Sequence, residues 1–497
     1  MPAEEEKMNT IIGYILMAAT LAFFGYVGYK STNEKELDQD NYLSARGSQN
    51  WLKVGLSLFA SGMGIWILFG PSEVGYYGGF WDVVGYAIAA AAPFLLLAYV
   101  GPMVRKKLPE GVTLADYVRM KIGRPMQLYV GIISIIYMFT FLFAEFTAIG
   151  KAMKILSGMD PLIPMFAVGF VTTAYTAHGG LPASLRTDRW QAWVVMWLTI
   201  SLLFILFIGD IGNLIGDAKA YNPDDEWSFG SISYMESFSS GLALVVAITA
   251  AEMFSQGNWQ RTWASEDDDA LKRGAILAAI LVLPLVFIMG FLGTVVAGRG
   301  NPIVDGIYDP SSSFFVLLSD SSIFLISGFV VLGIALVCSS IDTLQNAVAA
   351  SITRDISDGK MDLKQARIAT VMMIPLAIYL ATGPSVFGIE INAGSVFAIF
   401  LFADLLAAAT VLPVFLTLSN RIDSRMSLLG GISGLTSVIV YGWVTIDLSS
   451  GLEYIISPTN ESGLANLGVF LSALIGSGLV TIVGSLLLKK YDYKSIN

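Results

Sequence analysis

Apolar runs of roughly 20 residues recur along the whole chain. An α-helix needs a run of this length to cross the ~30 Å hydrocarbon core of a bilayer. The alternation of a membrane-spanning β-strand is absent from these runs. Of the 497 residues, 55% are hydrophobic and 14% are charged, whereas a soluble domain has about 25% charged residues. We therefore predict an all-α polytopic membrane protein and not an enzyme.

The apolar runs predict about thirteen transmembrane helices. The first follows the acidic residues Glu4, Glu5 and Glu6, whereas a secretory signal begins with basic residues, so we expect it to be retained. A short amphipathic helix at the membrane surface is expected at residues 112–122. The predicted spans are residues 9–30, 51–79, 80–104, 126–156, 160–177, 183–209, 233–260, 270–298, 322–352, 364–383, 390–418, 426–446 and 463–488.

The placement of Lys and Arg predicts the orientation, because cytoplasmic loops carry an excess of these residues. With the N-terminus outside and the C-terminus in the cytoplasm, most of the 29 basic residues, Arg261 among them, fall in cytoplasmic loops. The exceptions are Lys7, Lys151, Lys154, Lys219 and Arg299. We expect a multi-pass protein of the cell (plasma) membrane. Its net charge of −10 argues against a nucleic-acid partner, which would need clustered basic residues.

The second span contains features that weaken a helix. Gly62, Gly64 and Gly70 are followed by Pro71 and Glu73. Proline removes a backbone donor and clashes with the preceding turn. Broken backbone at membrane depth is tolerated only inside protein or along a water-filled cavity, and it marks the binding site of many secondary transporters. The alternative is a Gly/Pro kink that serves packing.

The ninth span carries oxygen-bearing side chains within an apolar helix. Ser339, Ser340 and Thr343 surround Asp342. Hydroxyls alone often bond back to their own helix, but a carboxylate inside the membrane is costly and needs a partner or a cavity. By extension from calcium and magnesium, oxygen ligands suit a hard cation such as sodium.

Three more acids lie inside predicted spans: Glu145, Glu252 and Asp404. No Lys or Arg lies in the middle of any span. A neutral or cationic solute is therefore expected in preference to an anion. Alternatively, some of these acids pair with neighbouring hydroxyl groups and have no ligand.

Three motifs, in order, resemble the sodium:solute symporter family. The resemblance covers nearly the whole chain and its thirteen-span layout. It rests on Gly179-Gly180-Leu181-Pro182-Ala183-Ser184 with Thr187-Asp188-Arg189-Trp190-Gln191, on Gln260-Arg261 with Lys272-Arg273-Gly274, and on Ser339-Ser340-Ile341-Asp342-Thr343 running to Arg354-Asp355-Ile356.

The resemblance implies a single transporter domain over residues 1–497, built from two inverted five-helix repeats. The repeats would be residues 51–209 and 233–418, with an extra N-terminal helix at 9–30 and two C-terminal helices at 426–488. It also implies a sodium site formed by carbonyls and hydroxyls of Ala60, Met63, Leu336, Ser339 and Ser340. A possible second sodium site would comprise Asp188, Asp342 and Thr343. Sodium is the coupling ion, and no other cofactor is implied.

The substrate prediction is sodium-coupled import of a small polar solute by alternating access, with urea as the best guess. Bacterial proline carriers of the family have an aspartate where this chain has Gly62, and the segments around Trp66 and Gln256 look closer to the urea/polyamine branch. The expected solute ligands are Trp66, Glu73, Glu252 and Gln256. Proline or another small solute, proton coupling and, less favoured, a passive channel remain as alternatives.

Overall fold

The computed structural model describes residues 8–30, 38–208, 211–220, 235–300, 303–304, 307–318, 321–386, 389–390, 396–419, 421–461 and 463–496. Residues 209, 233–234 and 391–395 of the predicted spans lie outside these ranges. The described part is almost entirely helical. Two short antiparallel hairpins interrupt it: β1 (Ile303–Val304) with β2 (Ile307–Tyr308), and β3 (Ser385–Val386) with β4 (Ile389–Glu390).

Within the described residues, ten helices are long and apolar enough to cross a membrane. This finding confirms the prediction of an all-α polytopic membrane protein. The ten are α1 (Thr10–Tyr29), α4 (Gly70–Lys107), α6 (Arg124–Ser157), α9 (Met235–Glu252), α11 (Asp268–Arg299), α13 (Ile323–Ser351), α14 (Leu363–Ala381), α15 (Val396–Phe415), α16 (Ser424–Thr445) and α18 (Leu467–Ile496).

The remaining helices connect or extend these ten. The predicted surface helix at 112–122 is present as α5 (Leu114–Lys121), which a Thr113–Asp116 capping box begins. The others are α2 (Gln39–Ser44), α3 (Trp51–Gly62), α7 (Leu162–Ile208), α8 (Ile211–Ala220), α10 (Gln256–Ala264), α12 (Ser313–Leu318) and α17 (Leu448–Ile456), with the 3-10 turns η2 (Ile65–Leu68), η3 (Pro310–Ser312) and η5 (Leu416–Leu418) and the π-turn η4 (Ile352–Ile356).

Two long helices each fold back at a glycine. Gly79 in α4 has φ 67° and Gly180 in α7 has φ 60°. This left-handed conformation is open to glycine but costly for other residues. The two bends fall at residue 79, where the second predicted span ends, and at residue 180, between the fifth and sixth. Each long helix therefore consists of two segments.

Two further helices are interrupted rather than bent. Met63 leaves the helical region with φ −102° and ψ 84°, so α3 ends there and η2 begins at Ile65. The break predicted in the second span is therefore present. Residues 253–255 separate α9 from α10 in the same way.

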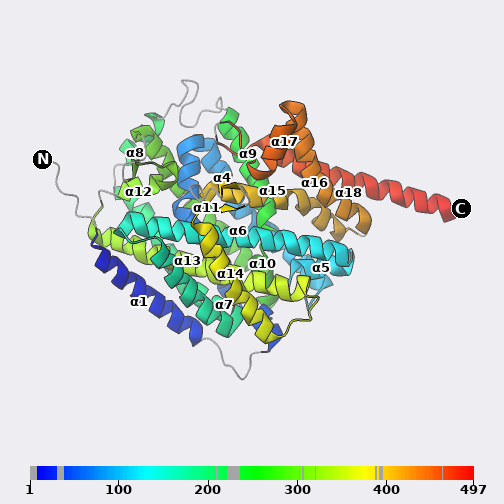
Figure 1. The fold of residues 1–497 in the computed structure, drawn as a ribbon, viewed down its shortest axis with the longest axis horizontal. Coiled ribbons are helices and arrows are strands. Elements are labelled where there is room, and N and C mark those ends of the chain that lie inside the picture. The colour runs from blue at the N-terminus through cyan, green and yellow to red at the C-terminus, as the bar shows by residue number, and fades with distance from the viewer. Residues whose placement is uncertain are drawn as a thin grey trace.

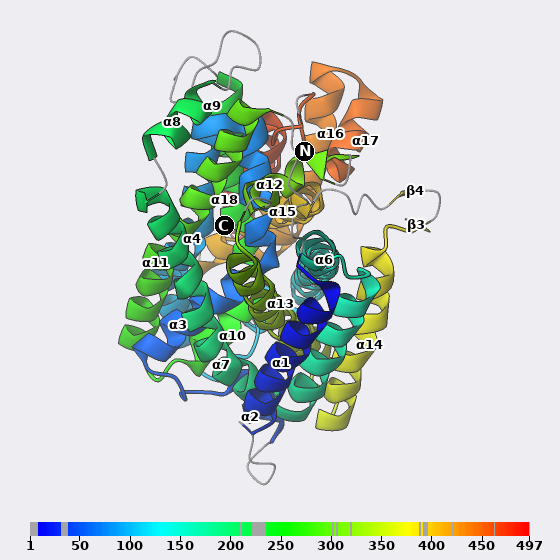
Figure 2. The same cartoon turned by 90° about the vertical axis from the view of Figure 1, so that its left-hand side faces the viewer.

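The interrupted helices lie in the interior of the bundle. α4 packs against α9 and α11, while α13 packs against α6 and α7. α1 covers α7 from the outside (Figure 2). α16 pairs with α18, which extends beyond the rest of the bundle (Figure 1). The breaks in α3 and α9 are thus enclosed by protein, the setting in which non-helical backbone is tolerated in a membrane.

Candidate ion and solute site

The break after α3 supplies carbonyl oxygens at the end of a helix. Ala60 lies in the last turn of α3, and Met63 follows its last residue. The Ala60 carbonyl accepts the Met63 N–H at 3.2 Å, and the carbonyls at the end of a helix carry the negative end of its dipole. This location favours a cation.

Two serine hydroxyls of α13 face this region, and each donates to a different buried carboxylate. Ser339 Oγ donates to Asp188 Oδ1 at 2.9 Å, and Ser340 Oγ donates to Glu145 Oε2 at 2.5 Å. A hydroxyl that donates its proton retains oxygen lone pairs for a cation. The Leu336 carbonyl lies one turn earlier and accepts a longer contact of 3.3 Å from Ser340.

Asp188 also connects α7 to α3 and α10. Its Oδ2 accepts from Ser57 at 2.5 Å and from the Arg261 guanidinium at 2.8 Å. Arg261, which the sequence analysis expected in a cytoplasmic loop, is fully buried, because every residue of α10 is buried in the protein. The same Arg261 Nη2 donates to Thr343 Oγ1 at 2.8 Å. A guanidinium therefore lies between two residues of the predicted second sodium site.

Asp342, the third residue of that predicted site, is held by hydroxyl groups of α7. Ser184 donates to it at 2.6 Å, Tyr175 at 2.6 Å and Thr187 at 3.0 Å. The structure thus brings Asp188, Asp342 and Thr343 into one buried network. Sequence reasoning missed the part played by Arg261, which is 73 residues from Asp188 in the chain.

A cavity lies beside the two helix breaks. Trp66 and Glu252, both predicted solute ligands, line it. So does Asp404, which the sequence singled out as a buried acid without assigning it to the site. The lining residues are Gly62, Met63, Trp66, Tyr86, Ala90, Phe94, Tyr137, Phe141, Ile248, Glu252, Phe397, Phe400, Leu401 and Asp404.

The two carboxylates of the cavity have different partners. Glu252 accepts hydrogen bonds from Tyr137 Oη and Asn258 Nδ2, both at 2.9 Å. Asp404 is only 2% exposed, and none of the described side chains donates a hydrogen bond to it. The lining contains no Lys, Arg or His. A buried carboxylate is costly unless a cation or a proton neutralises it.

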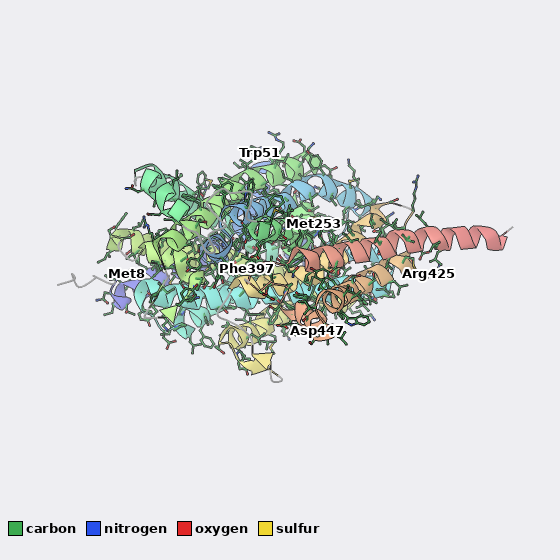
Figure 3. All side chains as sticks on the ribbon, turned by 90° about the horizontal axis from the view of Figure 1, so that it is seen from above. Met8, Trp51, Met253, Phe397, Arg425 and Asp447 are labelled. Carbon is green, nitrogen blue, oxygen red and sulfur yellow. The ribbon has the colours of Figure 1, made fainter. Side chains whose placement is uncertain are left out.

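The rest of the wall is mainly aromatic. Trp66 stacks on Tyr86 with ring centroids 5.9 Å apart and meets Phe400 edge-on at 6.2 Å. The ring centroids of Phe141 and Phe400 are 4.1 Å apart. Aromatic faces attract ammonium groups through their quadrupoles. In Figure 3, Phe397 of this wall and Met253 of the α9 break lie toward the middle of the molecule, whereas Trp51 and Asp447 lie at its edges.

The other two predicted solute ligands lie away from the cavity lining. Gln256 donates to the Val112 carbonyl at 2.6 Å and accepts from the Leu114 N–H at 3.0 Å, so it ties α10 to the start of α5. Glu73 is buried in the first turn of α4. Neither belongs to the lining.

An ion pair lies near the residue that follows η2. Lys151 of α6 contacts Asp309 at 2.6 Å, and its ammonium lies 5.6 Å from the centre of the Phe69 ring. Burial alone would raise the pKa of Asp309, but the charge of Lys151 and hydrogen bonds from Lys151, Ser312 and Ser311 hold that pKa below its ordinary value of 3.8. Asp309 therefore remains ionised at neutral pH.

Comparison with known proteins identifies the family. The sequence profile described as "Sodium:solute symporter family" matches residues 42–434. The chain belongs to this family. It is accordingly a membrane transporter with a solute and Na+ as its binding partners, and the family resemblance read from the sequence is confirmed.

Several curated relatives have named substrates. The chain is 28% identical over 488 residues to "Spermidine transporter DUR31" of Candida albicans, covering 96% of this chain and 89% of the relative. It is 23% identical over 367 residues to the "Urea active transporter" of Saccharomyces cerevisiae, covering 68% and 49%. It is 25% identical over 215 residues to the "High-affinity proline transporter PutP" of Bacillus subtilis, covering 41% and 44%.

Solved structures share the fold. A Na+-coupled sialic acid symporter in a substrate-bound outward-open state matches with a TM-score of 0.72 and 16% identity, covering 96% of this chain and 98% of that one. Mhp1, a nucleobase-cation-symport-1 family transporter in a closed conformation, matches with a TM-score of 0.57 and 14% identity, covering 92% and 96%.

Proposed function

We propose that this symporter couples sodium entry to the import of a solute that carries at least one ammonium group. The observation that carries the proposal is the cavity that contains Glu252 and Asp404 but no basic side chain. Two carboxylates enclosed by aromatic rings match an amine cation. Such a cation would neutralise buried charge and contact the ring faces of Trp66 and Phe400.

A compound with two or more ammonium groups, such as a polyamine, fits the pair of carboxylates best. The relationship to a protein named as a spermidine transporter, which extends over nearly the whole chain, supports this choice. Urea, the solute predicted from the sequence, is the second candidate. The urea transporter of yeast is a relative, and the carboxylate oxygens could accept urea N–H bonds. Urea would leave the charge of Asp404 uncompensated.

Proline and other amino acids fit less well. An amino acid brings a carboxylate as well as an ammonium group, and the cavity lining offers that carboxylate no cationic side chain. Gly62, which stands where the proline carriers have an aspartate, lies in the wall and removes a further charge from it.

We propose that one sodium ion binds between the end of α3 and α13, at Ala60, Met63, Leu336, Ser339 and Ser340. The Glu145 carboxylate, which is bonded to Ser340, supports a cation there, and Ser339 is bonded to Asp188. At Asp188 and Thr343, by contrast, Arg261 already provides the positive charge. We therefore assign no second sodium ion to that network.

The driving force is sufficient with one ion. A sodium charge crossing 100 mV contributes about 2.3 kcal/mol, and a tenfold sodium gradient about 1.4 kcal/mol. Their sum, roughly 3.7 kcal/mol, sustains a gradient of about 500-fold for a neutral solute. Each positive charge on the solute adds its own share of the membrane potential.

The proposal includes the arrangement of the chain in the membrane. The ten long helices, the broken segment 51–79 and the two segments of α7 correspond to thirteen spans. Residues 51–209 and 233–418 each begin with an interrupted helix, consistent with two inverted repeats. We place the N-terminus outside, the C-terminus in the cytoplasm, and the protein in the plasma membrane.

Uptake by proteoliposomes tests the function. Labelled putrescine, spermidine, urea and proline would be offered with an inward sodium gradient, with an equal potassium gradient, and with a proton ionophore. Sodium-driven accumulation of the amines, insensitive to the ionophore, is expected. Accumulation of urea but not amines would overturn the cationic assignment. Uptake driven by the proton gradient would show that the proton, and not sodium, is the coupling ion. Uptake that depends on neither gradient would indicate a passive channel.

A further inference from the structure

Glu145 of α6 bonds both to Ser340, a proposed sodium ligand, and to the backbone of Trp66, whose ring lines the solute cavity. It is fully buried and bonds to two different elements. Its Oε2 accepts from Ser340 on α13 at 2.5 Å, and from the backbone N–H of Ile65 at 3.0 Å. Its Oε1 accepts from the backbone N–H of Trp66 at 3.3 Å. The two N–H groups belong to η2, the turn that follows the break in α3.

The carboxylate takes the place of a missing helix cap. Gly64, at the N-terminal end of η2, has no side chain to accept hydrogen bonds from the first N–H groups of that turn. Such groups need an acceptor when they are buried. A side chain 80 residues away supplies it. The position and orientation of η2 therefore depend on where Glu145 lies.

Close contact between Glu145 and the break makes this dependence strict. A Cβ atom added at Gly64 would lie 2.2 Å from Glu145 Oε1 and 2.6 Å from its Cδ. No larger residue fits there unless the carboxylate moves. Glu145 is thus seated directly against the interrupted backbone.

The same turn also forms part of the cavity wall. Trp66 donates its backbone N–H to Glu145 and places its indole ring in the cavity wall, 7% exposed and stacked on Tyr86. Ser340, which donates to the other oxygen of the same carboxylate, is a proposed sodium ligand. The Ser340 hydroxyl is thus linked through the Glu145 carboxylate to the backbone of Trp66, and the ring of Trp66 lines the cavity.

We propose that Glu145 is the positioning residue that couples sodium binding to solute binding. Sodium bound to Ser340 Oγ orients the hydroxyl proton toward Glu145. The carboxylate is then held where it accepts both N–H groups of η2, and Trp66 is held in the geometry that the solute needs. This inference rests on the proposed function for its sodium site, but it does not depend on which solute is transported.

Calorimetric titration measures the coupling directly. The apparent solute Kd would be compared with and without saturating sodium, with spermidine as the probe. Glu145→Gln retains the shape of the side chain but replaces one acceptor oxygen with an NH2 donor, which faces other donors. We expect the sodium-induced gain in solute affinity to shrink at least fivefold. Binding energies at two sites that are linked in this way are reciprocal, so solute should also lose its effect on sodium affinity.

Thr147→Val is the matched control. Thr147 lies half a turn further along α6, is buried, and bonds to the carbonyls of Phe143 and Ala381 rather than to η2. This variant should retain the wild-type ratio of solute affinities with and without sodium. A wild-type ratio in Glu145→Gln would overturn the inference.

Hydrogen exchange on the wild-type protein keeps the inference testable if Glu145→Gln does not fold. Sodium alone, without solute, should slow amide exchange in a peptide that contains residues 64–69 at least threefold relative to potassium. If exchange is unchanged in a protein that still shows sodium-driven uptake, the coupling role of Glu145 is refuted and the proposed function is not. Slowed exchange in a protein that does not bind amines would instead refute the proposed solute and leave the coupling role in place.

Discussion

Arg261 and Asp188 form a fully buried ion pair, with Arg261 Nη2 2.8 Å from Asp188 Oδ2. Asp188 in turn accepts from Ser339, a proposed sodium ligand, through its other oxygen. Removing one partner of a buried ion pair costs about 3–5 kcal/mol, because the other charge is left uncompensated. Substituting Arg261 therefore tests how many sodium ions the protein binds.

Arg261→Gln should create a demand for a second sodium ion. The Hill coefficient for sodium in uptake should rise from near one toward two, and the variant should be less thermostable in potassium than in sodium. Arg261→Lys retains the positive charge and serves as the control, with a Hill coefficient that stays near one. If sodium does not stabilise Arg261→Gln more than it stabilises wild type, the guanidinium is not replacing a cation.

Asp404 is expected to distinguish charged from neutral solutes. Asp404→Asn should weaken spermidine binding about tenfold or more, equivalent to about 1.4 kcal/mol, because a buried ammonium would lose its counter-charge. Urea binding should change little. Competition against labelled spermidine at saturating sodium measures both. Equal losses for the two solutes would point to a structural role for Asp404.

Glu252→Gln is expected to weaken solute binding more than sodium binding. Its carboxylate lines the cavity, whereas the proposed sodium ligands lie on α3 and α13. The effect should be larger for spermidine than for urea. Isothermal titration at saturating sodium checks this. Solute affinity identical to that of wild type would remove Glu252 from the site.

The two serines of α13 should govern the sodium requirement. Ser339→Ala and Ser340→Ala should each raise the sodium concentration for half-maximal uptake roughly three- to tenfold, because each variant loses a cation ligand and a hydrogen bond to a carboxylate worth about 1.5–3 kcal/mol. Ser327→Ala, earlier on the same helix, is the control. Normal uptake by both α13 variants at limiting sodium would place the ion elsewhere.

The ion pair of Lys151 with Asp309 should limit access to Phe69 from the predicted outer side. In a Cys338→Ala background, Asp309→Asn should increase the labelling rate of Phe69→Cys by an impermeant maleimide severalfold. Because the pKa of Asp309 is lowered, the pair is fully formed above the ordinary carboxyl value of 3.8 and is lost only as the pH falls through the lowered pKa. The ratio of the labelling rates with and without Asp309→Asn should therefore stay the same between pH 8 and pH 5.

Hydropathy and glycine placement account for much of the fold. The membrane-crossing helices could be predicted because a bilayer requires long apolar segments, and the break after α3 because Gly62 and Gly64 flank it. The break after α9 could not be predicted in this way. Its residues, 253–255, include no glycine or proline, so tertiary contacts rather than local preference determine it.

The site could be predicted only in part. Acids inside apolar helices are visible in a sequence, and Glu145, Asp188, Glu252, Asp342 and Asp404 all lie in the ion network or the cavity. Their partners are not visible. Ser340 is 195 residues from Glu145, and no spacing rule links them. Gln256 lies away from the cavity lining for a related reason: the α9 break removes the helical register that would have placed it on the face of Glu252.

The acids of the proposed solute site and the ligands of the proposed sodium site come from different helices. Glu252 and Asp404 belong to α9 and α15, whereas the proposed sodium ligands belong to α3 and α13. Substitutions on α9 or α15 can therefore alter substrate choice in a descendant protein without disturbing energy coupling. A lineage that inherits this division can change its substrate through a few mutations, each of which leaves a functional symporter.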